Sequence, residues 1–315
     1  MSKTRSHVLS AIFRQLKSRP SFDSIGIENY RKLLEKSALA FKPDKSVKAE
    51  SFYINGIEAQ WLLPLCHNEK HIIMYIHGGG LIAGSIKSHR DLASRIAVAS
   101  KAKVLIFNYR LAPEHPFPAG LEDVKTIYQW LTNRYKDGYK ISIVADSAGA
   151  GLALGILSML LNSARSLPVC TVLLSPWIDL ECKNNSLIEN RKKDPLLTHD
   201  ALKKTARLYT DHDDLSNSLI SPVNNNFSGI CPLLIQTGEN EVLIDDSKIL
   251  AQKLEQANAV VQLDIWKEMF HVWHYFAKYL LEGREAINEI GSFIKQYSQK
   301  QQSCKKQNIK IKANQ

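Results

Sequence analysis

The sequence has few features of a secreted, metal-binding or membrane-spanning protein. Its 315 residues include five cysteines, an odd number without a Cys-x-x-Cys pair, so we expect neither a disulfide framework nor a metal site. The longest apolar run, near 148–161, is too short to span a bilayer. The basic N-terminus leads into an amphipathic stretch, which does not resemble a signal peptide. We therefore expect a cytoplasmic protein that is not stably inserted in a membrane.

Signatures of nucleotide and nucleic-acid binding are also absent. No Gly-x-Gly-x-x-Gly leads into a helix, and there is no Gly-Lys-Ser or Gly-Lys-Thr sequence. The formal charge is +10, from 41 Lys and Arg against 31 Asp and Glu. Much of this excess lies in the polar C-terminal stretch 299–315, which lacks apolar periodicity and which we expect to be a disordered tail. The charge therefore predicts no nucleic-acid partner.

Two segments that each follow a short apolar run carry the strongest functional signal. They read Tyr75-Ile-His-Gly-Gly-Gly80 and Val144-Ala-Asp-Ser-Ala-Gly149. In the second, Ser147 lies between an apolar strand and an apolar helical run, which is typical of a nucleophile elbow. A serine that only caps a helix is the alternative. The glycines of the first segment expose N–H groups that suit a developing oxyanion, so the pair predicts a nucleophile beside an oxyanion hole.

An acid and a base follow later in the chain. The apolar run 232–236 leads into a loop, 237–246, with several carboxylates, and the run 260–266 leads to His271. Serine, acid and histidine thus occur in the order of α/β hydrolases. We expect His271 to be a catalytic base rather than a surface histidine, because it lies just beyond a strand end, where open parallel sheets assemble their sites.

From about residue 22 to about residue 297 the chain resembles the hormone-sensitive-lipase family of bacterial esterases. The family signatures His-Gly-Gly-Gly and Gly-Asp-Ser-Ala-Gly stand here as His77-Gly-Gly-Gly80 and Ala145-Asp-Ser-Ala-Gly149. Further matches are the segments 109–119, 194–198, 220–222 and 271–274. Ala145 departs from the pattern, which has glycine at that position.

The resemblance implies a role for each matched residue. Carried over by position, the site comprises the nucleophile Ser147, the base His271, the oxyanion-hole N–H groups of Gly79, Gly80 and Ala148, and the supporting residues His77, Gly78 and Asp146. The triad acid aligns with Glu241, and Asp245 is the alternative, because the loop reads Glu-Val-Leu-Ile-Asp where many members have Asp-Pro-Leu-Arg-Asp. Acyl transfer by such a triad needs no metal or organic cofactor.

The apolar runs predict an α/β fold with a mostly parallel, doubly wound sheet. They are near-continuous rather than alternating, as expected for strands covered on both faces, and lie at 72–76, 104–107, 141–145, 169–174 and 233–235. Helical stretches alternate with them, and a strand pair at 46–54 and 57–63 precedes them. The resemblance implies an eight-stranded α/β-hydrolase fold in a single domain, 1–298, with helices on both faces and a helical cap formed by 1–45 and 181–229.

Three functions agree with this sequence. The resemblance implies a serine carboxylesterase acting on short- to medium-chain acyl esters, a small-molecule substrate. A lactone hydrolase would use the same triad on a cyclic ester. The third is a non-catalytic small-ligand-binding module, since plant gibberellin receptors resemble this family but have lost the catalytic histidine; the presence of both Ser147 and His271 favours an enzyme. An edge strand at 260–266 could pair two copies into a homodimer.

Overall fold

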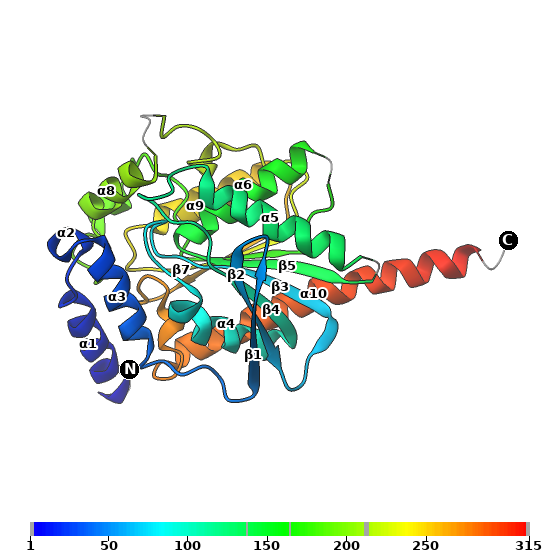
Figure 1. Cartoon of the computed structure of the whole chain (residues 1–315), viewed down its shortest axis with the longest axis horizontal. Helices are drawn as coiled ribbons and strands as arrows, with labels where there is room; N and C mark the ends of the chain where they lie inside the picture. The colour runs from blue at the N-terminus through cyan, green and yellow to red at the C-terminus, as the bar shows by residue number, and fades with distance from the viewer. Residues whose placement is uncertain (1–2, 137, 164, 211–213, 313–315) are drawn as a thin grey trace.

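The centre of the fold is an eight-stranded sheet with the strand order β1-β2-β4-β3-β5-β6-β7-β8 (Figure 1). The computed structural model describes residues 3–136, 138–163, 165–210 and 214–312. The strands are β1 (Val47–Ile54), β2 (Ile57–Pro64), β3 (Asn68–Ile76), β4 (Ala102–Phe107), β5 (Lys140–Asp146), β6 (Thr171–Leu174), β7 (Leu233–Gly238) and β8 (Val261–Trp266). β2 runs antiparallel to β1 and β4, and all the other neighbours pair in parallel. The predicted eight-stranded, mostly parallel sheet is confirmed.

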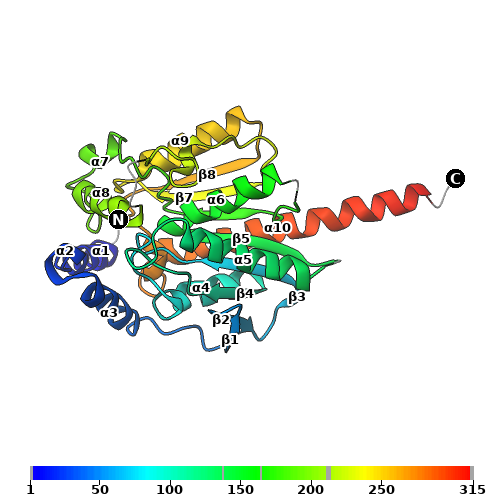
Figure 2. The ribbon, with the colours of Figure 1, turned by 45° about the horizontal axis from the view of Figure 1, so that its top comes forward.

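Helices cover both faces of the sheet. Alternate residues of β3 belong to two different cores: Met74 packs on one face, and Tyr75 packs on the other. The first face is covered by α5 (Ala119–Arg134), α6 (Ala148–Asn162) and α9 (Ile244–Gln256), and the second by α4 (Ile86–Ser100) and α10 (Leu281–Lys312) (Figure 2). This two-sided burial explains why the central strands read as near-continuous apolar runs.

Five helices lie together at one end of the molecule (Figure 2). They are α1 (Lys3–Lys17), α2 (Phe22–Ile25) and α3 (Ile27–Ala38) from the N-terminal part, and α7 (Ser186–Glu189) and α8 (His199–Tyr209) from the segment between β6 and β7. Lys204 on α8 forms an ion pair of 3.0 Å with Asp23 on α2. The ring of Phe13 on α1 packs edge-on against Phe270, 5.3 Å away, just beyond β8. The two predicted cap segments are therefore neighbours in space.

The C-terminal segment, which the sequence predicts to be a disordered tail, follows directly on the last helix. α10 continues to Lys312 and projects away from the body of the molecule (Figure 1), while residues 313–315 lie outside the described residues. The stretch 299–312 contains neither glycine nor proline. A helix whose earlier turns are already anchored, here by the buried residues Ile290 and Ile294, extends through such a stretch without a new nucleation cost. Disorder of the tail 299–315 stays a prediction.

Strands β1 and β8 form the two edges of the sheet. Val260 and Ile265, at and within the β8 edge, are 55% and 45% exposed. Pairing of two copies through this edge stays a prediction. Within the described ranges, no helix combines the length and apolarity needed to cross a bilayer. The same residues contain no group of three or more His, Cys, Asp or Glu side chains placed to hold a metal ion.

The central strands should carry most of the stability of the fold. Leu173 on β6 is fully buried, whereas Leu65, after β2, is 82% exposed. We expect Leu173→Ala to lower the free energy of unfolding by about 2–5 kcal/mol, because it removes buried apolar contacts and leaves a cavity. The matched change Leu65→Ala should alter it by less than about 0.5 kcal/mol. Urea unfolding of both variants measures the difference, and equal losses would contradict the assigned core.

Candidate active site

Ser147 occupies a tight turn between β5 and α6. Its backbone has φ 53° and ψ −125°, a conformation that non-glycine residues rarely adopt. The N–H of Ser147 donates to the carbonyl of Leu174 at 2.8 Å, and its carbonyl accepts from the N–H of Trp177 at 3.1 Å. The end of the neighbouring strand β6 thus holds the strained residue in place. The predicted strand–turn–helix context of Ser147 is present.

The three-glycine loop lies directly against this turn. A Cβ atom added to Gly149 would lie 2.6 Å from the carbonyl oxygen of His77, and one added to Gly78 would lie 2.9 Å from Cβ of Ser147. Neither contact can be relieved by rotating a flexible side chain, because one atom is backbone and the other is a Cβ. Glycine at these two positions therefore allows the loop and the elbow to approach each other closely.

Ser147, His271 and Glu241 form a continuous hydrogen-bonded chain. Nδ1 of His271 lies 2.9 Å from Oε2 of Glu241, and its Nε2 lies 2.9 Å from Oγ of Ser147. A carboxylate only accepts hydrogen bonds, so Nδ1 carries the proton in the neutral ring and Nε2 accepts from the serine hydroxyl. The structure thus brings together the three residues that the sequence singles out.

Glu241 is fully buried and held by several donors. Its Oε1 accepts from the hydroxyl of Ser175 at 2.7 Å and from the N–H of Gly238. The same Ser175 hydroxyl oxygen accepts from the N–H of Val272 at 3.0 Å, which ties the acid to the histidine segment. Asp245, the alternative acid, instead accepts from the N–H of Ser186 at 2.9 Å. The geometry therefore pairs His271 with Glu241.

The loop glycines present donors beside the serine. Gly79 and Gly80 have φ of 114° and 66°, and neither N–H has a hydrogen-bond partner in the part of the chain that the structure describes. Ala148 is the first residue of α6, where a helix leaves its N–H groups unpaired and its dipole is positive. The three N–H groups named from the sequence thus belong to segments that flank Ser147.

The comparisons with known proteins agree with this geometry. A model of the α/β-hydrolase fold family matches residues 73–275. The chain belongs to this family, among the bacterial hormone-sensitive-lipase-like esterases.

Individual relatives match over most of the chain. An acetyl-hydrolase of Streptomyces hygroscopicus is 38% identical over 237 residues, covering 75% of this chain and 79% of the relative. An esterase of Acinetobacter venetianus is 30% identical over 275 residues, covering 87% of this chain and 90% of the relative. The crystal structure of an esterase from the bacterial hormone-sensitive lipase family superposes with a TM-score of 0.89 at 34% identity, covering 95% of this chain and 99% of that chain. The crystal structure of EstE5 soaked with p-nitrophenyl butyrate superposes with a TM-score of 0.87 at 35% identity, covering 92% of this chain and 98% of that chain. The protein is accordingly a carboxylic ester hydrolase.

In this esterase the electrostatic environment raises the pKa of His271. Burial by itself lowers that pKa, but the hydrogen bond and charge of Glu241 outweigh it, and Asp194 and Asp146 add to the increase. Asp194 is buried and accepts from the N–H of Val242 at 3.0 Å, beside the acid. Burial raises the pKa of Asp194 itself. The histidine is therefore surrounded by carboxylates that favour its cation.

Asp146, the last residue of β5, is buried next to Ser147. Its carboxylate accepts from the hydroxyl of Tyr75 at 2.8 Å and lies 3.4 Å from Nε2 of His89, and both partners are buried. Burial raises the pKa of Asp146, but His89 and Tyr75 lower it by a larger amount. The net shift of this pKa is therefore downward. These contacts fit the expected bracing role better than a reacting one.

His77 is a buried structural histidine. Its Nδ1 lies 2.8 Å from the carbonyl oxygen of Gly78, and its ring stacks on Tyr109 with centroids 4.3 Å apart. Burial lowers the pKa of His77 to about 3, so the ring is neutral and donates through Nδ1. The ring therefore contacts the glycine loop at Gly78, which fits the supporting role that the resemblance implies.

Three residues of this network are missing from the sequence-based site: Ser175, Asp194 and His89. Ser175 follows β6 directly, and its place at a strand end is the one signal that could have revealed it. Asp194 begins a segment that matches the family, but its contact with the acid loop joins residues 48 positions apart. His89 lies inside α4, where its spacing resembles that of any buried helical residue.

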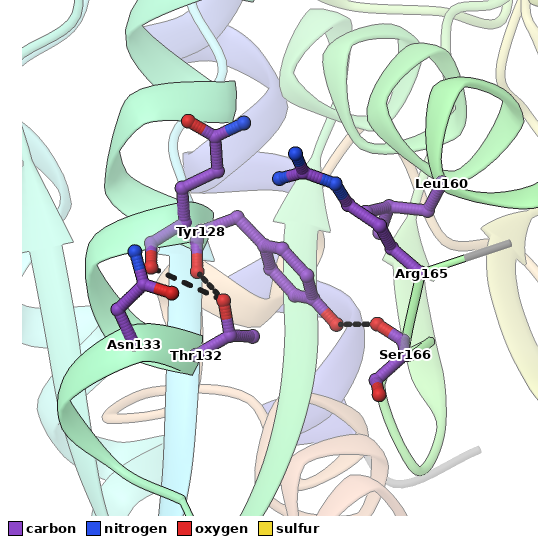
Figure 3. Close-up of a pocket in the computed structure, with 7 residues that line it drawn as sticks. Tyr128, Thr132, Asn133, Leu160, Arg165 and Ser166 are labelled. Carbon is purple, nitrogen blue, oxygen red and sulfur yellow. Dashed lines mark hydrogen bonds between the residues drawn. The ribbon is translucent and has the colours of Figure 1, made fainter. Parts of the chain in front are cut away.

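A separate cavity of about 530 Å³ lies between the C-terminal parts of α5 and α6 (Figure 3). Its lining includes Tyr128, Leu160 and Arg165, and the Tyr128 hydroxyl donates to the Ser166 carbonyl at 2.8 Å. Leu160 is almost the whole length of α6 away from Ser147, about 20 Å along the helix axis. The cavity is therefore not part of the candidate active site.

The close approach of loop and elbow can be tested on α6. We expect Gly149→Ala to lower the free energy of unfolding by about 1–3 kcal/mol, because the new methyl meets the carbonyl of His77. Gly155 is the matched control: an added Cβ there meets mainly the movable tip of Leu121, so Gly155→Ala should be neutral or stabilising. Chemical denaturation measures both, and a neutral Gly149→Ala would show that loop and elbow are farther apart.

Proposed function

We propose that the protein is a serine carboxylesterase that hydrolyses short- to medium-chain acyl esters through Ser147, His271 and Glu241. The observation that carries the proposal is the hydrogen-bonded chain from Glu241 through His271 to Ser147, beside loop N–H groups that have no partner within the described ranges. The acetyl-hydrolase relative, and the soaking of EstE5 with a butyrate ester, support a preference for short acyl groups.

The geometry supports acyl transfer in two steps. His271 takes the proton of the Ser147 hydroxyl as its oxygen attacks the ester carbonyl, and Glu241 holds the ring and stabilises its cation. The N–H groups of Gly79, Gly80 and Ala148 stabilise the oxyanion of the tetrahedral intermediate. The alcohol leaves with the proton from His271, and water then hydrolyses the acyl-enzyme by the same sequence.

The segments 1–45 and 181–229 complete the proposal as a cap over this site. A Cβ added to Gly80 would lie 3.1 Å from the side chain of Thr205 on α8, so α8 covers the glycine loop. Leu202 and Tyr209 on the same helix are buried in the main core. This helix therefore limits the room available to the acyl or alcohol group of a substrate.

The first test is hydrolysis of p-nitrophenyl acetate, butyrate, octanoate and laurate by the wild type and Ser147→Ala. We expect turnover to fall for the longer chains and to drop about 10⁶-fold in the variant, because the nucleophile is lost. Circular dichroism should show the same fold for both proteins. Residual turnover close to wild type in a folded Ser147→Ala would refute the assigned nucleophile. A folded wild type that cleaves lactones but none of these esters would favour the lactone hydrolase.

The second test concerns the acid and the pH profile. Glu241→Gln should lower kcat by about 10³- to 10⁴-fold, because an amide at this position no longer stabilises the histidine cation or enforces its tautomer. The matched change Asp245→Asn should cost only a few-fold, since Asp245 bonds elsewhere.

The pH dependence has a definite sign. His271 must be neutral to accept the serine proton, and its pKa is raised, mainly by Glu241 against the effect of burial. Wild-type kcat/KM should therefore fall as the pH drops through a value above 6.5, the ordinary pKa of histidine. Removing the charge of Glu241 should move this acid limb to lower pH. A greater loss in Asp245→Asn, or an unmoved limb in Glu241→Gln, would transfer the role to another carboxylate.

A further inference from the structure

The glycine loop depends on contacts from outside itself. Beyond Gly80 the strained backbone continues, since Leu81 has φ 65° and is not a glycine. Within the loop, the N–H groups of Ile82 and Ala83 donate to the carbonyl of Gly79 at 3.3 and 3.0 Å. These two bonds do not hold the carbonyls of Leu81 and Ile82. A conformation of this kind persists only when the surrounding structure fixes it.

Arg31 on α3 supplies one of the missing contacts. Its Nε donates to the carbonyl of Ile82 at 2.6 Å, and its Nη2 donates to the carbonyl of Ala112 at 2.8 Å. The N–H of Ala112 in turn donates to the carbonyl of Leu81 at 3.0 Å. One guanidinium group therefore fixes both the loop and the segment that supports it.

The guanidinium is itself oriented by a carboxylate. Nη1 and Nη2 of Arg31 donate to the two oxygens of Glu114, both at 2.8 Å. This hydrogen bonding lowers the pKa of Glu114 to about 2, so the carboxylate is ionised. The planar fork of arginine matches such a two-point contact, which the single ammonium of lysine cannot reproduce.

A second residue of α3 holds the far end of the loop. Glu35, one helical turn after Arg31, accepts from the hydroxyl of Ser85 at 2.9 Å. Ser85 is the N-cap of α4, so the contact lies where the loop ends and the helix begins. Residues four apart lie on the same helix face. One face of α3 therefore contacts the loop at two points, Ile82 and Ser85.

We infer that Arg31 is a positioning residue for the oxyanion hole, acting from the N-terminal segment through the carbonyls of Ile82 and Ala112. The inference rests on the proposed function, since it assumes that Gly79 and Gly80 bind the oxyanion. Arg31 lies outside every matched motif. Its effect on the reaction is to keep the N–H groups of the loop aimed at the oxyanion rather than to touch the substrate, and small displacements of such donors are costly.

The experiment measures kcat and KM for p-nitrophenyl butyrate in Arg31→Gln and Arg31→Lys, per active site titrated with an organophosphate. We expect kcat to fall about ten- to a hundredfold in Arg31→Gln, with KM changed less than about twofold, because the loss affects the transition state. The inhibition constant of an alkyl trifluoromethyl ketone, which forms a tetrahedral adduct with the serine, should rise in parallel. Arg31→Lys should show the same split, since it keeps the charge and loses the fork.

Two further variants separate the contacts. Glu114→Gln retains the bonds of Arg31 to both carbonyls and should cost no more than about threefold in kcat. Lys32→Gln, on the same helix, breaks an exposed ion pair with Glu28 and should behave like the wild type. Tyr30 and Leu34 still pack α3 against the main core in every variant, so the helix keeps its apolar anchors.

The outcomes distinguish positioning from mere support. If the Arg31 variants only melt at lower temperature and lose titratable sites, while kcat per site stays at the level of Lys32→Gln, the inference is overturned. If Arg31→Gln does not fold, the kcat of Arg31→Lys decides by the same criterion. A folded wild type without ester hydrolysis would contradict the proposed function, and this inference with it. Normal wild-type turnover with unaffected Arg31 variants would overturn this inference alone.

Discussion

The candidate active site depends on the backbone hydrogen bonds that join the ends of adjacent parallel strands. Just beyond β5, the N–H of Ser147 donates to the end of β6. Just beyond β6, the N–H of Ser175 donates to β7. Just beyond β7, the N–H of Glu239 donates to Trp266 at the end of β8. The carboxyl ends of parallel strands lie side by side at the same end of the sheet. Each of these hydrogen bonds therefore fixes where the loop after a strand begins. Ser147 and Glu241, which are far apart in the sequence, are thereby each placed within hydrogen-bonding distance of the His271 ring.

Buried charge is the second constraint on this arrangement. The carboxylates of Glu241 and Asp146 are almost completely shielded from water, where an ionised group is stable only with partners. Glu241 has Ser175 and His271, and Asp146 has Tyr75 and His89. Because the surroundings are of low polarity, each of these interactions is stronger than it would be at the surface. The supporting residues are therefore needed for folding as well as for the orientation of the histidine.

Much of this could be predicted from the sequence, because the relevant signals are local. Ser147 and the glycine loop are recognised by small residues next to apolar runs, and the sheet by runs that helices cover on both sides. The contacts that complete the site are long-range: Ser175 to Glu241 spans 66 positions, and Arg31 to Ile82 spans 51. No spacing rule connects such pairs. For the C-terminal tail, composition alone does not distinguish an isolated segment from one that continues an anchored helix.

The family pattern to which the sequence was compared has aspartate at the position of Glu241, and the path of the Glu241 side chain explains why a glutamate fits here. Oε1 of Glu241 turns back to the N–H of Gly238 at the end of its own strand, while Oε2 reaches Nδ1 of His271. The main chain between Gly238 and Glu241 forms a turn, in which the N–H of Glu241 donates to the carbonyl of Gly238 at 3.2 Å. An aspartate on this backbone, shorter by one carbon, could not keep both contacts. The extra carbon of glutamate thus lets the carboxylate reach His271 from a turn that begins directly after β7. The hydrogen bond to the histidine is made although the residue is a glutamate rather than an aspartate.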